Sequence, residues 1–138
     1  MRTVGVTAIV LFALSLQGCK DDSSPLNKLF GGKLDVVTGA DRVEAFRVDW
    51  SYRGAPAASR PARPPTTQSV VGLPVLAGPL PVSATQASQL AKVLNDPATY
   101  AFESRKRCIF HPDVAIRFWL GDQNVKVVFC FSCDELEV

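Results

Sequence analysis

Apolar and polar residues alternate most regularly in the C-terminal third of the chain, where period two predicts two strands joined by a turn at residues 121–124. We expect Leu120 to pair with Val125, because this register places every large apolar residue on one face of the hairpin. Ile116 and Phe129 then form the central cross-strand pair. The apolar face comprises Val114, Ile116, Phe118, Leu120, Val125, Val127, Phe129 and Phe131.

A third strand is predicted over residues 42–52, where Phe46, Val48 and Trp50 alternate with polar or small residues and are therefore expected to point inward. Residues 70–82 are apolar but contain three prolines. Because proline donates no hydrogen bond to a strand ladder, we expect this segment to form a short hairpin at the edge of the sheet.

One helix is predicted after this segment. Ser83 is a typical N-cap residue, and Gln86 three positions later completes a capping box. The apolar residues that follow recur at the spacing of one helical face, and they are Ala87, Leu90, Ala91 and Leu94. We expect this face to pack across the hairpin. The predicted fold class is therefore α+β, a small antiparallel sheet with one helix packed on it.

The composition of the chain predicts its domain organisation. The length of 138 residues suits a single domain. Residues 53–69 are rich in proline and arginine and have no aliphatic residue larger than alanine, so we expect a disordered loop there. Residues 19–40 begin as a polar segment and are expected to form a flexible tether. The folded domain is then predicted to cover residues 41–138.

The first eighteen residues are predicted to be a secretory signal peptide. Arg2 is their only charged residue, and the thirteen residues from Val4 to Leu16 contain no charge. This stretch is shorter than the roughly 20 apolar residues that span a bilayer. We therefore expect the mature protein to be exported.

The end of the signal peptide resembles the lipobox of bacterial lipoproteins, with Leu16-Gln17-Gly18-Cys19 followed by a polar run. Gln17 departs from the family pattern, which has a small residue there. The resemblance implies cleavage before Cys19 and lipidation of its thiol. The lipid would then anchor the N-terminus of the mature protein in the membrane, its expected partner. Lys20 follows where an aspartate would retain an enterobacterial lipoprotein at the inner membrane, which favours the outer membrane. The alternative is an ordinary signal peptide with a coincidental cysteine.

Charge and motifs exclude several functional classes. The formal net charge is +2, which argues against nucleic acid as a partner, because phosphate recognition normally shows as a strongly basic domain. The chain has no G-x-S-x-G elbow and no glycine-rich phosphate loop. We therefore predict no catalytic residue, no enzymatic activity and no cofactor.

Three cysteines of the mature chain and the single histidine allow three interpretations. Cys108, His111, Cys130 and Cys133 have the spacing of a zinc site. In an exported protein, however, a disulfide is favoured over zinc. We expect Cys108 to bridge Cys133, with Cys130 to Cys108 as the second choice, because a C-x-x-C pair in one strand points its side chains apart. The third possibility is a redox pair formed by Cys130 and Cys133.

The same region also resembles a group of small exported bacterial proteins that share a C-terminal C…P…C-F-x-C block, here Cys108, Pro112 and Cys130-Phe131-Ser132-Cys133. The resemblance implies that the three cysteines act together, and it implies no activity. The sequence thus predicts a cell-envelope lipoprotein that serves as a non-enzymatic structural or interaction module. The alternative is a thiol-redox or zinc-binding envelope protein that uses Cys108, Cys130 and Cys133.

Overall fold

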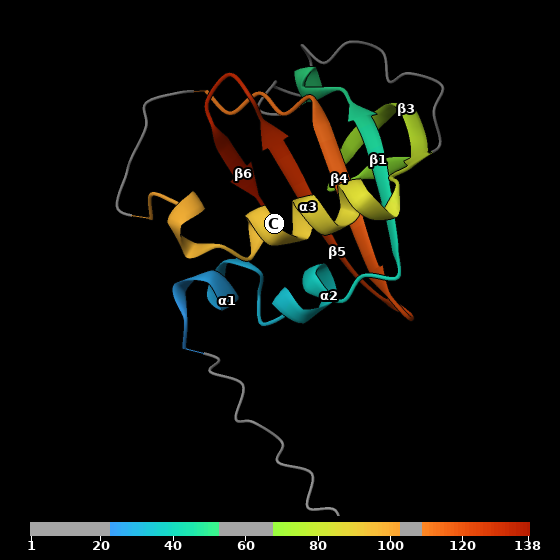
Figure 1. The fold of residues 1–138 in the computed structure, drawn as a ribbon. Coiled ribbons are helices and arrows are strands. Elements are labelled where there is room, and N and C mark those ends of the chain that lie inside the picture. The colour runs from blue at the N-terminus through green and yellow to red at the C-terminus, as the bar shows by residue number, and fades with distance from the viewer. Residues whose placement is uncertain (1–22, 53–67, 103–108) are drawn as a thin grey trace, which may run out of the picture.

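Six antiparallel strands form one curled sheet in the computed structural model of the protein, which describes residues 23–52, 68–102 and 109–138 (Figure 1). The strand order is β2-β3-β1-β4-β5-β6. The strands are β1 (Arg42–Val48), β2 (Ser69–Val70), β3 (Leu73–Pro81), β4 (Val114–Leu120), β5 (Gln123–Cys130) and β6 (Glu135–Glu137). Together with short helices this sheet confirms the α+β class.

The helices lie on one face of the sheet, with α3 across its front and α1 and α2 below α3 (Figure 1). Their bounds are Pro25–Leu29 for α1, Leu34–Thr38 for α2 and Ala84–Leu94 for α3, and two 3-10 turns cover Trp50–Tyr52 and Pro97–Thr99. Among the described residues, no helix has the length and hydropathy needed to cross a membrane.

The predicted capping box starts α3. The Ser83 hydroxyl accepts from the Gln86 backbone N–H at 3.3 Å, and the Ser83 backbone N–H donates to the Gln86 side-chain oxygen at 3.2 Å. The helix ends at Leu94, where the N–H of Asn95 still bonds to the Ala91 carbonyl. Both predicted ends of this helix are confirmed.

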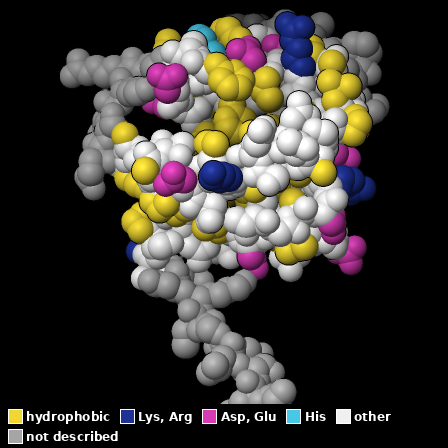
Figure 2. All heavy atoms as spheres, in the orientation of Figure 1, with side chains coloured by type: hydrophobic (Ala, Val, Ile, Leu, Met, Phe, Trp, Pro, Cys, Tyr) yellow, Lys and Arg dark blue, Asp and Glu magenta, His cyan; other side chains and the backbone are white. Residues whose placement is uncertain are grey.

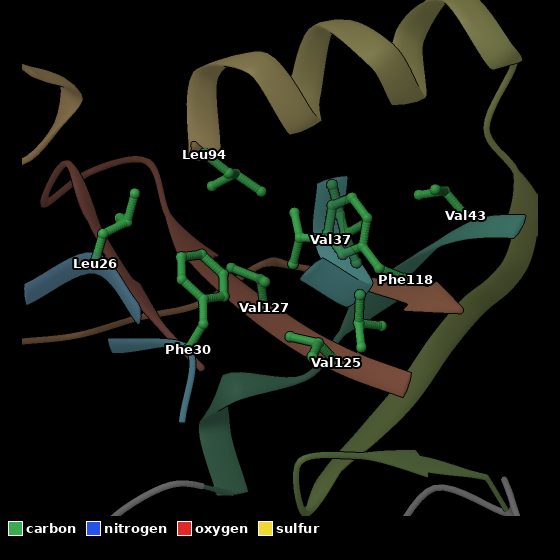
Figure 3. Packing of buried hydrophobic residues seen from close by; sticks show 10 residues of the cluster. Leu26, Phe30, Val37, Val43, Leu94, Phe118, Val125 and Val127 are labelled. Atoms are coloured by element: carbon green, nitrogen blue, oxygen red, sulfur yellow. The ribbon is translucent and has the colours of Figure 1, made fainter. Parts of the chain in front are cut away.

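The core between the sheet and the helices is built mainly by α1 and α2, so the expectation of a single helix across the sheet is not confirmed. Only Leu94 of α3 is fully buried, while Ala87 and Leu90 are partly buried. Figure 3 shows side chains from the helices and the strands meeting in this core. Its buried members are Leu26, Phe30, Val36, Val37, Val43, Leu94, Ile116, Phe118, Val125 and Val127.

The boundary predicted at residue 41 is wrong, because the second half of the predicted tether is folded. Ser24 caps α1 by accepting from the Asn27 backbone N–H at 3.0 Å, and Leu26 and Phe30 are buried. Helices of five residues carry too little periodicity to show in a sequence pattern, and they depend on tertiary packing for stability. The signal peptide at 1–18, Cys19 and most of the loop predicted at 53–69 lie outside the described residues, and Ser69 belongs to β2.

The hairpin of β4 and β5 has a register two residues away from the predicted one. Leu120 pairs with Gln123, so the connection has two residues instead of four. Ile116 consequently pairs with Val127 and not with Phe129. The predicted central pair is therefore wrong, although both strands are where the alternation placed them.

The conformation of Gly121 accounts for the shorter turn. Its φ of +56° is the left-handed conformation that the favoured two-residue hairpin turns require at their first central position. A shift of two residues leaves each side chain on its predicted face, and Phe118 and Val127 are buried as expected. Phe131 now falls beyond the end of β5, and 67% of its surface is exposed.

The other face of the sheet is partly covered by the sheet itself. Phe46 and Val48 are buried there as predicted, but β1 ends at Val48, and Trp50 lies exposed in a 3-10 turn. The pairing of β1 with β3 is irregular at two places, and such bulges bend a strand. The bent β3 and its neighbour β2 contribute to a second core of Phe46, Val48, Val70, Leu73, Val75, Ala115 and Val128. β2 and β3 thus form a hairpin at one edge of the sheet, as predicted, and β2 pairs only with Leu73 and Pro74. β3 is nevertheless one strand of nine residues despite its prolines, and its second half is an open edge among the described strands.

Gly78 permits the bend of β3, and its replacement by alanine is expected to destabilise the domain. Gly78 has a φ of +113°, and an added Cβ would lie 2.7 Å from the Ala45 carbonyl oxygen. We expect Gly78→Ala to lower the free energy of unfolding by about 2–4 kcal/mol through backbone strain and overpacking, measured by urea unfolding. Gly31→Ala is the control, because Gly31 also has a positive φ but nothing lies within 4 Å of its added Cβ. If both variants lost the same free energy of unfolding, the close approach of residue 78 to the Ala45 carbonyl would be contradicted.

Candidate functional site: a buried thiol beside an apolar cleft

The C-x-x-C segment forms a turn instead of continuing β5. Cys130 is the last residue of β5, and the Cys133 backbone N–H donates to the Cys130 carbonyl at 3.3 Å. Asp134 then adopts a left-handed φ of +52°. Residues at the ends of such a turn have Cα atoms less than about 7 Å apart, which is within the range of disulfides. The expectation that the two cysteines point apart along one strand is therefore wrong.

The two cysteines of this turn are in different chemical states. Cys130 is a free thiol and is buried, with 1% of its surface exposed. Cys133 is disulfide-bonded. Cys108 lies outside the described residues, so the predicted bridge from Cys108 to Cys133 stays a prediction. The second choice, Cys130 with Cys108, is not formed, because Cys130 carries no disulfide.

Hydrogen-bond donors surround the sulfur of Cys130. The Ser132 hydroxyl lies 3.3 Å from the Cys130 Sγ, and the His111 backbone N–H donates to the same atom at 3.3 Å. Burial raises the pKa of the Cys130 thiol, but the hydrogen bonds from the Ser132 hydroxyl and from the backbone of His111, Cys133 and Ser132 lower it by more. The net pKa of Cys130 lies below its ordinary value, so this pocket of donors stabilises a thiolate.

His111 serves this site through its backbone and not through its ring. The imidazole stacks on Trp50 with ring centroids 3.7 Å apart and an angle of 12° between the planes. The structure thus brings His111, Cys130 and Cys133 together as the zinc pattern predicts, but the Cys133 sulfur is held in a disulfide. In the part of the chain that the structure describes, no three His, Cys, Asp or Glu residues are placed to hold a metal ion.

An apolar cleft of about 650 Å³ lies beside the thiol, with Cys130 in its wall. Two stacked aromatic pairs line the cleft, Phe129 with Phe131 at a centroid distance of 6.1 Å and Tyr100 with Phe102 at 5.3 Å. Carboxylates from Asp134, Glu135 and Glu137 also line the cleft. The free thiol is therefore next to a space of the size and character that accepts small apolar molecules.

Tyr100 links this cleft to the end of α3. Its hydroxyl donates to the Leu94 carbonyl at 2.8 Å, which satisfies one of the carbonyls left open at a helix C-terminus. Burial raises the pKa of Tyr100 to about 12. The hydroxyl consequently keeps its proton and its hydrogen bond well beyond the pH at which an exposed tyrosine ionises.

Sequence reasoning missed the donors that define the thiol site. Ser132 occupies a variable position of the C-x-x-C pattern, which assigns it no role, and the backbone of His111 has no signature in the sequence. The available signal was the Ser-Cys-Asp segment after Cys130, since serine and aspartate are typical of turns. That signal was overridden by the strand alternation continuing through Phe131.

No protein-family model, curated protein or solved structure matches the chain in comparisons with known proteins. The fold and the site therefore carry the functional argument alone. The resemblances to bacterial lipoproteins and to exported proteins with a C…P…C-F-x-C block stay predictions.

Removing the Ser132 hydroxyl is expected to raise the pKa of Cys130. The folded pKa lies below the unfolded one, so the unfolded chain binds more protons between them and the free energy of unfolding rises with pH across that window. Ser132→Ala should move the thiolate titration, followed by ultraviolet absorbance, to higher pH and reduce this rise. Ser132→Thr keeps a hydroxyl and should titrate like the parent. An unchanged titration in Ser132→Ala would contradict the assigned hydrogen bond.

Proposed function

We propose that the chain is a lipid-anchored protein of the cell envelope, in the outer rather than the inner membrane, and that its domain is a non-enzymatic interaction module. Support for the anchor comes from the lipobox at Leu16–Cys19 and from the start of α1 at Pro25. Six residues span at most about 20 Å when fully extended. A lipidated Cys19 would therefore hold the α1 side of the domain close to the bilayer.

The observation that carries the interaction function is a surface formed by the second half of β3 and by α3, two elements whose only charged residue is Lys92. No charged residue lies between Arg63 and Lys92 in the sequence. Hydrophobic side chains on this surface are exposed, with 49% of Leu76, 60% of Leu80 and 51% of Val93 accessible. Figure 2 shows hydrophobic and uncharged atoms over most of α3, with a Lys or Arg and an acidic side chain near one end of the helix. Patches of this kind mark interaction sites on soluble domains.

A groove of about 520 Å³ runs between α3 and β3 within this surface. Leu90 and Val93 line it from the helix, and Pro81 and Val82 line it from the end of β3. The Val82 backbone N–H donates to the Val43 carbonyl of β1, so the neighbouring Pro81 directs its nitrogen toward the open edge, where it has no hydrogen to donate. Pairing of a partner's strand with this edge is therefore disfavoured. We expect a partner to bind by inserting its side chains into the groove.

We commit to another envelope protein with an uncharged apolar surface as the occupant. Figure 1 shows α1 and β3 at opposite sides of the domain, so an anchor next to α1 leaves the β3 part of this surface turned away from its own attachment point. A partner protein reaches this surface more readily than the bilayer does. The scarcity of charge disfavours an acidic or basic partner.

A photoreactive amino acid at Gln89, in the groove, tests this proposal in intact cells. We expect a cross-link to one envelope protein, and the purified partner should bind the parent protein but not Leu80→Asp, whose change is confined to an exposed side chain. As a control, the same photoreactive residue at Asp122, which is exposed in the turn between β4 and β5, should give no such cross-link. Adducts only with lipid, or only with a second copy of the chain, would overturn the proposal.

The second candidate is a thiol function that uses Cys108, Cys130 and Cys133, and the donors around the Cys130 sulfur favour it. A buried structural cysteine would have its thiol kept neutral by apolar neighbours. The Cys130 sulfur instead accepts a hydrogen bond from the His111 backbone N–H and lies 3.3 Å from the Ser132 hydroxyl, two contacts that favour its thiolate. The zinc version of this candidate is weaker, because Cys133 is already disulfide-bonded.

Within this thiol function we propose that the disulfide of Cys133 is made with Cys108. The Cys133 Sγ lies 3.2 Å from the carbonyl oxygen of Ile109, the residue that follows Cys108 in the chain. Cys130 is free and Cys19 is assigned to the lipid, which leaves Cys108 as the partner. Peptide mapping without reduction should show residues 108–117 joined to residues 127–138.

A further inference from the structure

We propose that the turn from Cys130 to Cys133 is a thiol–disulfide exchange site, in which Cys130 attacks Cys133 and closes a Cys130–Cys133 bridge. The inference rests on the thiol function above and gives it a specific reaction. A free thiol and a disulfide sulfur at the two ends of one turn are the reactants that such an exchange needs.

The Ser132 hydroxyl lies near both sulfurs. Its Oγ lies 3.3 Å from the Cys130 Sγ and 4.0 Å from the Cys133 Sγ. The hydrogen bond from the Cys133 backbone N–H to the Cys130 carbonyl closes the turn between them. Because the Cα atoms at the ends of such a turn lie within disulfide range, the new bridge requires side-chain rotation and little movement of the backbone.

The environment of Cys130 suits the attacking group. The thiolate is the nucleophile in disulfide exchange, and the donors from Ser132 and His111 stabilise that form. Burial with 1% exposure shields the sulfur from external thiols, so a disulfide within the same turn is the more accessible reaction partner. These features distinguish Cys130 from a cysteine that only fills space in a core.

The exchange balances within the chain. The Cys130 thiolate forms a bond to the Cys133 sulfur, and the bond between Cys133 and its present partner breaks. The electron pair leaves on the partner sulfur, which we assign to Cys108 and which then takes up the proton that Cys130 released. One disulfide and one thiol are present before and after, so no oxidant or reductant is needed. The result is that the free thiol moves from the buried turn to Cys108.

Non-reducing peptide mapping of the full-length protein tests the exchange. The protein is incubated at several pH values, quenched with acid and alkylated. In the resting state, trypsin should release peptide 108–117 joined to peptide 127–138, and cleavage by chymotrypsin after Phe131 should assign the link to Cys133. After exchange, peptide 127–138 should carry an internal bridge and be lighter by two hydrogens, while Cys108 becomes alkylated. Both signals should grow together with pH as the thiolate forms.

Two variants complete the test. Cys130→Ser removes the attacking sulfur, so the internal bridge and the alkylated Cys108 should both disappear. Cys108→Ser treated with oxidised glutathione should close the Cys130–Cys133 bridge directly. If the parent shows only the Cys108–Cys133 link at every pH, the exchange is overturned. If the resting protein lacks that link, the proposed bridge itself fails, and the two failures are thereby distinguished.

Discussion

Replacing Phe30 by alanine is expected to lower the free energy of unfolding by about 3–5 kcal/mol, the usual cost of truncating a fully buried phenylalanine. Phe30 caps the C-terminus of α1, and only 2% of its surface is exposed. It packs into the core with Leu26 and Val127 (Figure 3). A loss of this size is a large share of the stability of a small domain and should show as a lower midpoint of urea unfolding.

Phe131→Ala is the matched control, because the same atoms are removed from a side chain that is 67% exposed. Its effect on the unfolding midpoint should be within about 0.5 kcal/mol, as for most surface substitutions. If Phe30→Ala were as mild as Phe131→Ala, residues 25–40 would be a tether after all and α1 and α2 would not belong to the core.

Replacing Cys19 by serine is expected to abolish lipidation and, with it, the permanent attachment of the mature protein to the membrane. Acyl chains on Cys19 would contribute about 0.8 kcal/mol for each buried methylene, and no other attachment is proposed for the domain. The variant should appear as an uncleaved precursor or as a soluble exported protein. Partition between detergent and water, together with the mass of the N-terminus, measures the outcome.

Cys130→Ser provides the control for this experiment, because it makes the same chemical change within the folded domain. It should partition into detergent like the parent. If Cys19→Ser also partitioned like the parent and kept the same N-terminus, the lipoprotein assignment would be wrong. The surface at β3 and α3 would then become the first candidate for the membrane contact.

The sequence predicted those features whose signals are local. The capping box of Ser83 and Gln86 defined the start of α3 because both partners lie within one helical turn. The alternation around Phe118 and Val127 placed both strands of the hairpin and their buried faces, because side chains in a strand alternate with period two.

Tertiary structure decided between hairpin registers that the period-two pattern cannot distinguish. A shift of two residues leaves the hydrophobic pattern unchanged, so the backbone conformation at Gly121 determined whether Leu120 pairs with Gln123 or with Val125. The five-residue helices α1 and α2 have no usable periodicity and form because the sheet buries Leu26, Phe30 and their neighbours.

The candidate site shows the same division. The sequence singled out Cys130 and Cys133 by their spacing, but the alternation extended the strand through Phe131 and predicted that the two side chains diverge. Chain reversal after Cys130 instead closes a turn, and the backbone N–H of His111, nineteen residues away in the chain, reaches the Cys130 sulfur. Side-chain spacing alone determined which cysteines to consider, whereas hydrogen bonds from backbone groups distant in sequence decided which of them is a stabilised thiolate.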